Sequence, residues 1–336
     1  MRHENAPMSD VESWLADVSK GDRRRRAIDD PYLHKFQRRH FLLYNVTPGA
    51  LSLVACGLLF VRPVSAIDGA LFGALWLMTG LGISAGYHRL FTHKSWDAPR
   101  LVRATLAVWG SMAGMGPVIS WAAIHRRHHE CADGEGDMHS PNLHGKGARG
   151  RIRGFIHAHF TWMARHPYAN VAFYAPDLLR DRTLVWIGRR YHTWVAAGVL
   201  VPTLVGGLVS GSWWGALTGF LWGGAVRMWV VGNSIWALNS VLHTMGSRRF
   251  QEHPTDESRN SWLLALFAWG EGWHNNHHSF PASASFGLDW YRADLSYWFI
   301  RSLALVGLAS DVRVPSRKKI IDYENEARRN AADGAL

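Results

Sequence analysis

Two histidine triplets with the same spacing constrain this chain more than any other feature of its sequence. The first lies in an HRRHH string and the second, far downstream, in an HNNHH string. Their members are His125, His128 and His129, then His274, His277 and His278. If each segment is helical, positions i, i+3 and i+4 share a face, so we expect each triplet to aim three imidazoles at one point. Imidazole is the commonest metal-ligating side chain, and six exceed the needs of one tetrahedral ion, which predicts a site with more than one metal.

Long apolar segments flank both triplets. A bilayer core requires about 20 apolar residues in a helix. Segments of this kind predict four membrane-spanning helices at about 41–60, 69–87, 193–209 and 213–242, the last long enough to project beyond the bilayer. The segment 101–124 is also apolar, but it contains Arg103, several glycines and Pro117. We expect this segment to form an interfacial or buried pair of helices.

The basic residues indicate how the spans are oriented. The net charge is +11, and nearly all Lys and Arg lie outside the two short turns between paired spans. Positive loops face the cytosol, so we expect both termini there, most simply in a bacterial inner membrane. No nucleic-acid-binding motif accompanies the charge. The prediction is an all-α integral membrane protein with a basic arm (1–40), a membrane domain (41–312) whose helical cap (88–192 and 243–312) is cytosolic, and a polar tail (313–336).

Three further histidines fall on the same predicted side of the membrane as the triplets. His88 and His93 close the second span, and His243 lies at the projecting end of the fourth, one helical turn after Asn239. Nine imidazoles suit two metal ions with about four each. Soluble di-iron bundles use Glu-x-x-His motifs, which the HRRHH and HNNHH strings themselves lack. Redox-active iron would give such a site a catalytic role, although the ligand chemistry also admits copper or manganese. The nearest candidates for supporting these ligands are His139, His157 and His159.

Four sequence strings resemble one known family. They are GYHRLFTH at 86–93, WAAIHRRHH at 121–129, NSVLH at 239–243 and EGWHNNHHSFP at 271–281. In order and spacing they are similar to the membrane-bound acyl-CoA desaturases of the stearoyl-CoA desaturase type, over about residues 39–312. The resemblance implies four transmembrane helices beneath a cytosolic cap that holds two Fe²⁺ ions. It assigns the nine histidines as ligands and Asn239 as a ligand through water.

The same resemblance implies a narrow, bent tunnel for an acyl chain. Trp121 and Trp236 match positions that line it, and Arg165 matches a basic position near the CoA phosphates. Ile235 departs from the family, which often has a small hydroxyl residue there, and Met138 stands where proline is common. The chain has no haem or flavin motif, so electrons are expected from a separate donor such as a ferredoxin or a cytochrome b5-type protein with its reductase.

The function we expect is an O₂-dependent desaturase that introduces a cis double bond at the Δ9 position of a long-chain acyl-CoA. Another acyl carrier is an open alternative to CoA, and membrane lipid surrounds the protein. A hydroxylase or acetylenase with the same site is the nearest rival. A metal transporter is a rival of another class, but it would place ionisable ligands inside the spans. Arg227 lies within the fourth span and receives no role from the sequence.

Overall fold

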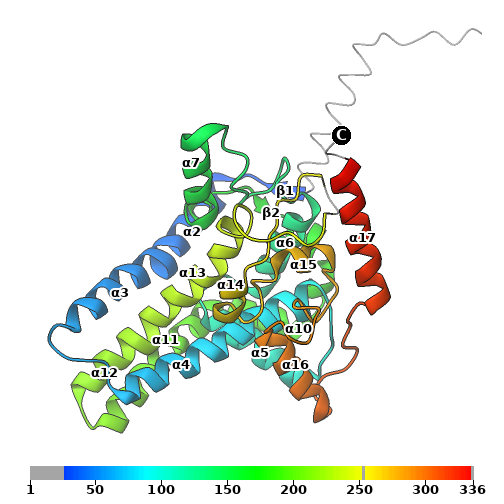
Figure 1. Ribbon diagram of the computed structural model, residues 1–336. Coiled ribbons are helices and arrows are strands. Elements are labelled where there is room, and N and C mark those ends of the chain that lie inside the picture. Colours follow the sequence, from blue (N-terminus) through cyan, green and yellow to red (C-terminus); the bar gives the residue numbers. More distant parts are fainter. Residues whose placement is uncertain (1–25, 252–253, 334–336) are drawn as a thin grey trace, which may run out of the picture.

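The computed structural model describes residues 26–251 and 254–333, and these residues are mostly helical (Figure 1). Long helices lie side by side at one end of the molecule, and shorter helices and loops gather at the other. The only sheet in the described ranges pairs β1 (Ala27–Ile28) with β2 (Tyr168–Ala169) in antiparallel register. The expectation of an all-α fold is therefore correct except for this two-residue pair.

The first long helix begins earlier than predicted. It runs continuously from Pro31 to Leu58 through α2 (Pro31–Phe41), η1 (Leu42–Val46) and α3 (Thr47–Leu58). Asp30 caps its start, because the carboxylate accepts the backbone N–H of Tyr32 at 2.7 Å, and Pro31 occupies the first helical position. Apolar composition reports only the bilayer portion of a helix, which is why the predicted start fell at residue 41. Of the predicted arm at 1–40, residues 1–25 lie outside the described ranges.

The second long helix carries the first histidine of the site. It consists of α4 (Ala66–Leu81) and η2 (Gly82–Thr92), which together form 27 continuous residues. Ser65 and Asp68 form a capping box at its start. The helix continues in π-helical form to Thr92, beyond the predicted span of about 69–87. His88 therefore lies on the helix itself, so the packing of this helix positions the His88 ring in the site.

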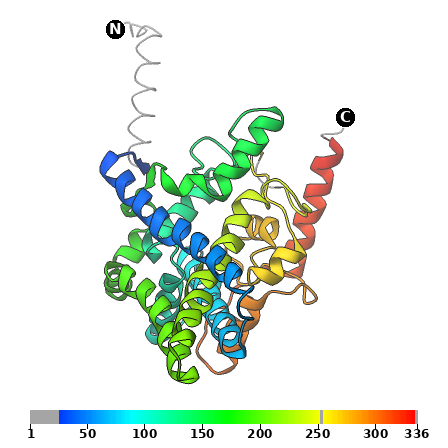
Figure 2. The same cartoon turned by 90° about the vertical axis from the view of Figure 1, so that its left-hand side faces the viewer.

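A third and a fourth long helix complete the bundle (Figure 2). The third is α11 (Tyr191–Ser210), which Gly211 ends in a left-handed conformation at φ 59°. Three helices of the described chain are long and apolar enough to cross a membrane, namely Pro31–Leu58, Ala66–Thr92 and Tyr191–Ser210. The fourth helix comprises α12 (Trp213–Gly219), η4 (Phe220–Val226) and α13 (Arg227–Ser240). It is less apolar because it contains glycines, tryptophans and Arg227.

Arg227 joins three helices through their backbones. Its guanidinium is fully buried and donates to the carbonyls of Gly223 at 3.1 Å, Met112 at 2.7 Å and Gly198 at 2.7 Å. Met112 is the last residue of α5 (Arg100–Met112), where carbonyls lack helical donors. Pro202 lies four residues after Gly198 within α11 and has no N–H to offer. Arg227 thus supplies donors at a helix end and at a proline interruption.

Shorter helices form the rest of the molecule. Between the second and third long helices lie α5, α6 (Val118–Glu130), α7 (Gly147–His159), η3 (Thr161–Ala164), α8 (Val171–Tyr174), α9 (Pro176–Leu179) and α10 (Arg182–Arg189). After the fourth come α14 (Trp262–Phe267), α15 (His274–Ser279), α16 (Leu295–Leu305) and α17 (Arg317–Asp333). The helix pair predicted over 101–124 is present as α5 and α6. The predicted polar tail is largely the helix α17, at the edge of the molecule in Figure 1.

Close contacts between small residues set the position of η2. A Cβ on Gly82 would lie 2.3 Å from the backbone nitrogen of Gly110 in α5, so the two helices approach more closely than any side chain allows. On the preceding turns of the same helix, Gly80 leaves room for the indole of Trp269, which is fully buried. These contacts fix η2 between α5 and the segment that precedes α15.

Candidate metal centre

The nine predicted histidines gather into two adjacent groups. Cluster one comprises His88, His93, His125, His129 and His277, and cluster two comprises His128, His243, His274 and His278. Within each cluster, one ring nitrogen of every member lies within 4.8 Å of the others. All nine histidines predicted as ligands thus lie in these two groups, and their role as metal ligands stays a prediction.

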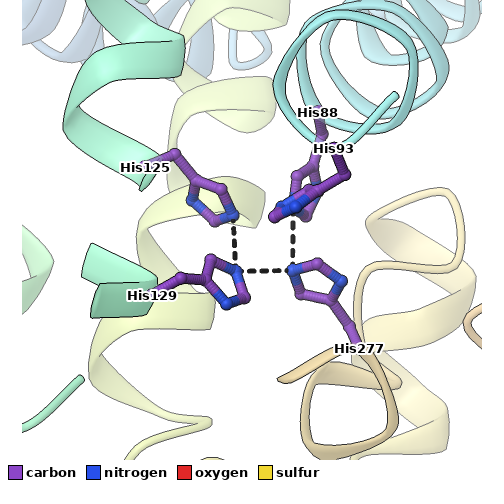
Figure 3. A group of neighbouring side chains, drawn as sticks. All are labelled: His88, His93, His125, His129 and His277. Carbon is purple, nitrogen blue, oxygen red and sulfur yellow. Dashed lines mark hydrogen bonds between the residues drawn. The ribbon is translucent and has the colours of Figure 1, made fainter. Parts of the chain in front are cut away.

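Cluster one joins three distant segments of the chain, as Figure 3 shows. Nε2 of His277 lies 3.0 Å from Nε2 of His88 and 2.9 Å from Nε2 of His129. Nε2 of His129 also lies 3.0 Å from Nε2 of His125. The ring of His93 lies against these imidazoles, with its centroid 4.7 Å from that of His277. The nitrogens of η2, α6 and α15 thus point toward one another.

Cluster two lies beside cluster one on the same two triplet helices. Nε2 of His243, just beyond α13, lies 3.0 Å from Nε2 of His274. The ring of His278 lies 4.4 Å from that of His274 and 5.1 Å from that of His128. It is also 4.4 Å from the ring of His129 in cluster one, so the clusters are direct neighbours.

Each triplet is divided between the two clusters. The i and i+4 members of the first triplet, His125 and His129, lie in cluster one, and its i+3 member, His128, lies in cluster two. In the second triplet the division is reversed: the i and i+4 members, His274 and His278, lie in cluster two, and the i+3 member, His277, lies in cluster one. The expectation that each triplet aims at one point was therefore wrong. Positions i+3 and i+4 lie on opposite sides of position i around a helix, so one face serves two neighbouring ions.

Three buried carboxylates and a fourth that is mostly buried contact the outer nitrogens of four of these histidines. Nδ1 lies close to a carboxylate oxygen in each pair, and the Nδ1–O distances for cluster two are 3.0, 2.6 and 2.8 Å. The pairs are His128 with Asp137, His243 with Asp133, His278 with Asp256, and His88 of cluster one with Glu271. A carboxylate at Nδ1 fixes the tautomer so that Nε2 carries the lone pair toward a metal.

Glu271, whose carboxylate contacts His88 of cluster one, belongs to a buried network of hydrogen bonds and ion pairs. One of its oxygens accepts from Ser84 and lies 3.4 Å from the guanidinium of Arg89. Arg89 also donates to Asp294 at 2.8 Å and stacks over Phe286 at 3.8 Å. All three charged groups are almost fully buried. The single carboxylate that orients His88 is therefore partly neutralised by a cation.

Burial sets the protonation of the imidazoles. It lowers the pKa well below the ordinary value of 6.5, and neighbouring imidazoles lower that pKa further, in His93, His125, His129, His274 and His277. Burial lowers the pKa of His278 to about 4 despite Asp256. It also opposes protonation of His128, but the charge of Asp137 outweighs it and the pKa of His128 is raised. Most of these rings are thus neutral at pH 7 and can offer lone pairs.

The donor set fits transition-metal ions. Within the described ranges, Nε2 of His93, His128 and His278 is buried and has no hydrogen-bond partner. An unpaired buried polar atom is costly, and a metal ion in each cluster would satisfy these nitrogens. Imidazole-only sites suit iron, copper, nickel or zinc. The clusters are compatible with the di-iron site that the sequence predicted.

The other predicted site residues lie outside the two clusters. Trp121 on α6 is stacked on His125, with ring centroids 5.0 Å apart, and is half-buried. Asn239 is half-buried in the last turn of α13, one turn before His243. Trp236 is buried on α13 and packs against Phe160 and His159. Arg165 is exposed just after η3. Their roles toward water and substrate stay predictions.

Of the three histidines named as candidates for supporting the ligands, His139 contacts a clustered imidazole. The ring of His139 lies 4.3 Å from that of His128, and its Nδ1 is 3.5 Å from Asp137. His157 is 3.1 Å from the carbonyl of Met138, and His159 is 2.9 Å from the hydroxyl of Ser240.

Sequence reasoning missed the supporting carboxylates. Glu271 stood in a quoted string without a role, and Asp133, Asp137 and Asp256 were not singled out. Asp137 follows His128 by nine residues, so a search for acids near the first triplet could have found it. Asp133 lies 110 residues from His243 in the chain, and Glu271 lies 183 residues from His88, which no local pattern reveals.

A small cavity connects the clusters with the surface. It has a volume of about 320 Å³ and is lined by both His129 of cluster one and His278 of cluster two, with Arg248 and Asp256 beside them. The two clusters are therefore reached from the same opening.

Comparisons with known proteins agree with this geometry. The sequence model described as fatty acid desaturase matches residues 69–305. The hex-5-enoyl-[acyl-carrier protein] acetylenase of Moorena producens (strain JHB) is 44% identical over 92% of this chain and 98% of its own length. The Delta-9 acyl-lipid desaturase 1 of Arabidopsis thaliana is 31% identical over 90% of this chain and 92% of its own. The sn-1 stearoyl-lipid 9-desaturase of Anabaena variabilis is 32% identical over 73% and 83%. The two histidine clusters, the apolar helices and these relatives together place the chain in the membrane fatty acid desaturase family.

Proposed function

We propose that this protein is an O₂-dependent di-iron enzyme that removes two hydrogens from adjacent carbons of a fatty acyl chain and leaves a cis double bond. The observation that carries the proposal is the convergence of nine imidazoles from four segments into two adjacent clusters. The nine histidines are the proposed ligands, with Asn239 acting through water. The same clusters lie at helix ends and among short helices, not inside the bundle, which favours an enzyme over a transporter.

Iron in these clusters would supply the activation of O₂ needed to break unactivated C–H bonds. The residues of this chain do the positioning. Glu271 and the three aspartates hold imidazole rings in orientation through Nδ1. Trp121, stacked on His125, gives cluster one an apolar wall against which an acyl chain can lie. Burial of the clusters keeps water away from the reacting carbons, and the path of the acyl chain decides which carbons are oxidised.

The acyl carrier and the position of oxidation are finer proposals. The sequence resemblance favoured acyl-CoA at Δ9, with Trp121 and Trp236 in the tunnel and Arg165 near the CoA phosphates. Two of the relatives are named for acyl lipids and Δ9 or 9-desaturation. Desaturation at Δ9 of a long acyl chain is therefore our first proposal, and the carrier is to be determined with CoA, carrier protein and lipid substrates.

A second candidate function is supported by the 44% identical relative. That protein is named as an acetylenase acting on an acyl-carrier-protein substrate, and the match covers 98% of it. Acetylenation repeats the same hydrogen removal on an existing double bond, so the same ligands serve both reactions. Our alternative proposal is therefore that the enzyme converts an enoyl group to an alkynyl group.

We also propose a membrane arrangement. The fourth long helix spans the bilayer with the three more apolar ones, and the short helices form a cytosolic cap around the clusters. Both termini lie on that side, since basic segments face the cytosol. Electrons reach the site from a separate donor such as a ferredoxin or cytochrome b5-type protein.

The test is a fatty-acid profile, with double-bond mapping by mass spectrometry, of a bacterial host that expresses this chain with a co-expressed ferredoxin and reductase. The His277→Ala variant is expressed beside it. A new monoene absent from the variant is the expected result and gives the chain length and position. A triple bond would select the acetylenase, and a hydroxy acid would overturn both in favour of a hydroxylase. Equal product from the His277→Ala variant would overturn the ligand assignment.

A further inference from the structure

The two clusters differ sharply in their electrostatic surroundings, although both are built from imidazoles. Three of the four histidines in cluster two have a carboxylate at Nδ1, whereas one of the five in cluster one does. The carboxylates of Asp133 and Asp137 are fully buried beside cluster two, and that of Asp256 is mostly buried. Negative charge with so little solvent around it acts strongly on a nearby cation.

Neutral groups also donate hydrogen bonds to these three aspartates. Asp133 accepts from the backbone N–H of Glu257 at 3.0 Å and the amide of Asn142 at 2.9 Å. Asp137 accepts from the backbone N–H of Asp133 at 2.9 Å. Asp256 accepts from the backbone N–H of Ser258 at 2.8 Å. These bonds orient the carboxylates without cancelling their charge.

No lysine or arginine within residues 26–251 and 254–333 forms an ion pair with any of the three aspartates. Cluster one is different, because its Glu271 lies beside the buried Arg89, which is shared with Asp294. Three carboxylates without a Lys or Arg ion pair therefore contact cluster two in the described residues, with Arg248 reaching only the backbone carbonyl of Asp256. The one carboxylate that contacts cluster one is partly balanced by Arg89.

We propose that cluster two is the tighter metal site and takes the first divalent ion, so that cluster one is filled second and emptied first. The inference rests on the proposed function only in requiring that both clusters bind metal. Access from solvent does not favour either cluster, because the cavity lined by His129 and His278 reaches both clusters. The order of filling is therefore set by affinity, and the three aspartates determine it. Each carboxylate also raises the basicity of its imidazole, which strengthens the bond to a cation.

The experiment is a titration of the metal-free, full-length protein in detergent with cobalt(II), in competition with a coloured chelator of known affinity. The wild-type protein is expected to bind two ions in two steps that differ by about tenfold or more. Two steps of equal affinity would overturn the inference and leave the proposed function standing. Failure to bind any cobalt, zinc or iron would overturn both.

Variants assign the steps. Asp256→Asn keeps the side-chain shape and removes the charge, so it is expected to weaken the tighter step by about 10- to 100-fold and to spare the weaker one. Glu271→Gln is expected to weaken only the second step. Glu257→Gln is the matched control, since it removes the neighbouring carboxylate, which pairs with Arg248 and Arg259 and contacts no histidine of either cluster in the described residues.

A variant that aggregates does not end the test. Asp137→Asn removes the charge of the carboxylate that contacts His128, a different histidine of cluster two. It is likewise expected to weaken the tighter step. An effect of either aspartate variant confined to the weaker step would overturn the assignment. The wild-type titration needs no variant and decides by itself whether the sites are unequal.

Discussion

The carboxylate of Asp133 lies 2.6 Å from Nδ1 of His243, although the two residues are 110 positions apart in the chain. Asp133 lies in the loop after α6, and His243 lies just past the end of α13. The contact therefore ties the first histidine triplet to the fourth long helix and fixes the ring that presents Nε2 to His274. The carboxylate contributes to the site without being a ligand.

We expect Asp133→Asn to weaken metal binding by about 10- to 100-fold, because His243 loses the charge that orients and activates it. Metal per chain, measured after dialysis against graded chelator concentrations, checks this. Asp97→Asn is the control, since Asp97 is largely exposed and pairs with Arg103. Equal retention of metal by the two variants would show that the contact with Asp133 is dispensable.

A second prediction concerns Arg126, which lies between the ligands of the first triplet. Its guanidinium makes two bonds to Asp177 and donates to the carbonyls of Phe91 and Thr92 at the end of η2. Arg126→Ala removes all of these and should cost about 3 kcal/mol of stability. Thermal unfolding of the metal-free protein measures the loss. Arg127→Ala is the adjacent control, because within the described residues the one hydrogen bond of its guanidinium goes to the carbonyl of Pro167, at 3.4 Å. A loss as large in the control would contradict the assignment.

The same ion pair predicts a pH dependence. Partial burial raises the pKa of Asp177, but hydrogen bonds from Arg126 and Lys94 outweigh it and hold the pKa well below 3.8. A depressed folded-state pKa means that the stabilisation is complete above 3.8 and is lost as pH falls below it. The difference in melting temperature between the metal-free wild type and Asp177→Asn should therefore be constant from pH 7 to about 5 and shrink toward pH 3. A difference that grew on acidification would refute this.

Arg227 gives a prediction inside the bundle. Arg227→Met should destabilise the protein by about 2 kcal/mol or more, since three buried carbonyls lose their donors. Pro202→Ala in the same chain restores an N–H four residues after Gly198, so the double variant should recover about 1 kcal/mol of that loss. Melting temperatures of the four proteins of this cycle give the coupling. Strict additivity would mean that Arg227 does not compensate for Pro202.

Two glycines on α4 provide a matched pair for packing. A Cβ on Gly80 would lie 1.8 Å from the indole of Trp269, whereas one on Gly73 would meet nothing within 4 Å. Gly80→Ala should therefore destabilise by about 1–3 kcal/mol through overpacking, and Gly73→Ala should be neutral or stabilising by up to about 1 kcal/mol. Thermal unfolding in detergent distinguishes them. Metal content should also fall in Gly80→Ala, because Trp269 precedes Glu271, which holds His88.

The sequence by itself determined the composition of the site and its family. Spacing and order picked out all nine clustered histidines, because metal chemistry restricts both the residue type and its periodicity. Apolar length located the long helices but misplaced their ends at Pro31 and Thr92, since hydropathy reports the bilayer and not the hydrogen-bonded helix. Arg227 had no role until the structure placed it against Gly198 and Met112.

Only the tertiary structure decided how the histidines are shared and supported. The i+3 member of each triplet joins the other cluster because the two helices pack so that one face borders two sites. Asp133 and Glu271 meet His243 and His88 through contacts between segments more than a hundred residues apart. Such contacts depend on packing of the whole chain, and local sequence patterns carry no information about them. The order and spacing of the histidines determine which ring nitrogens are available, and the tertiary structure determines which carboxylates contact them.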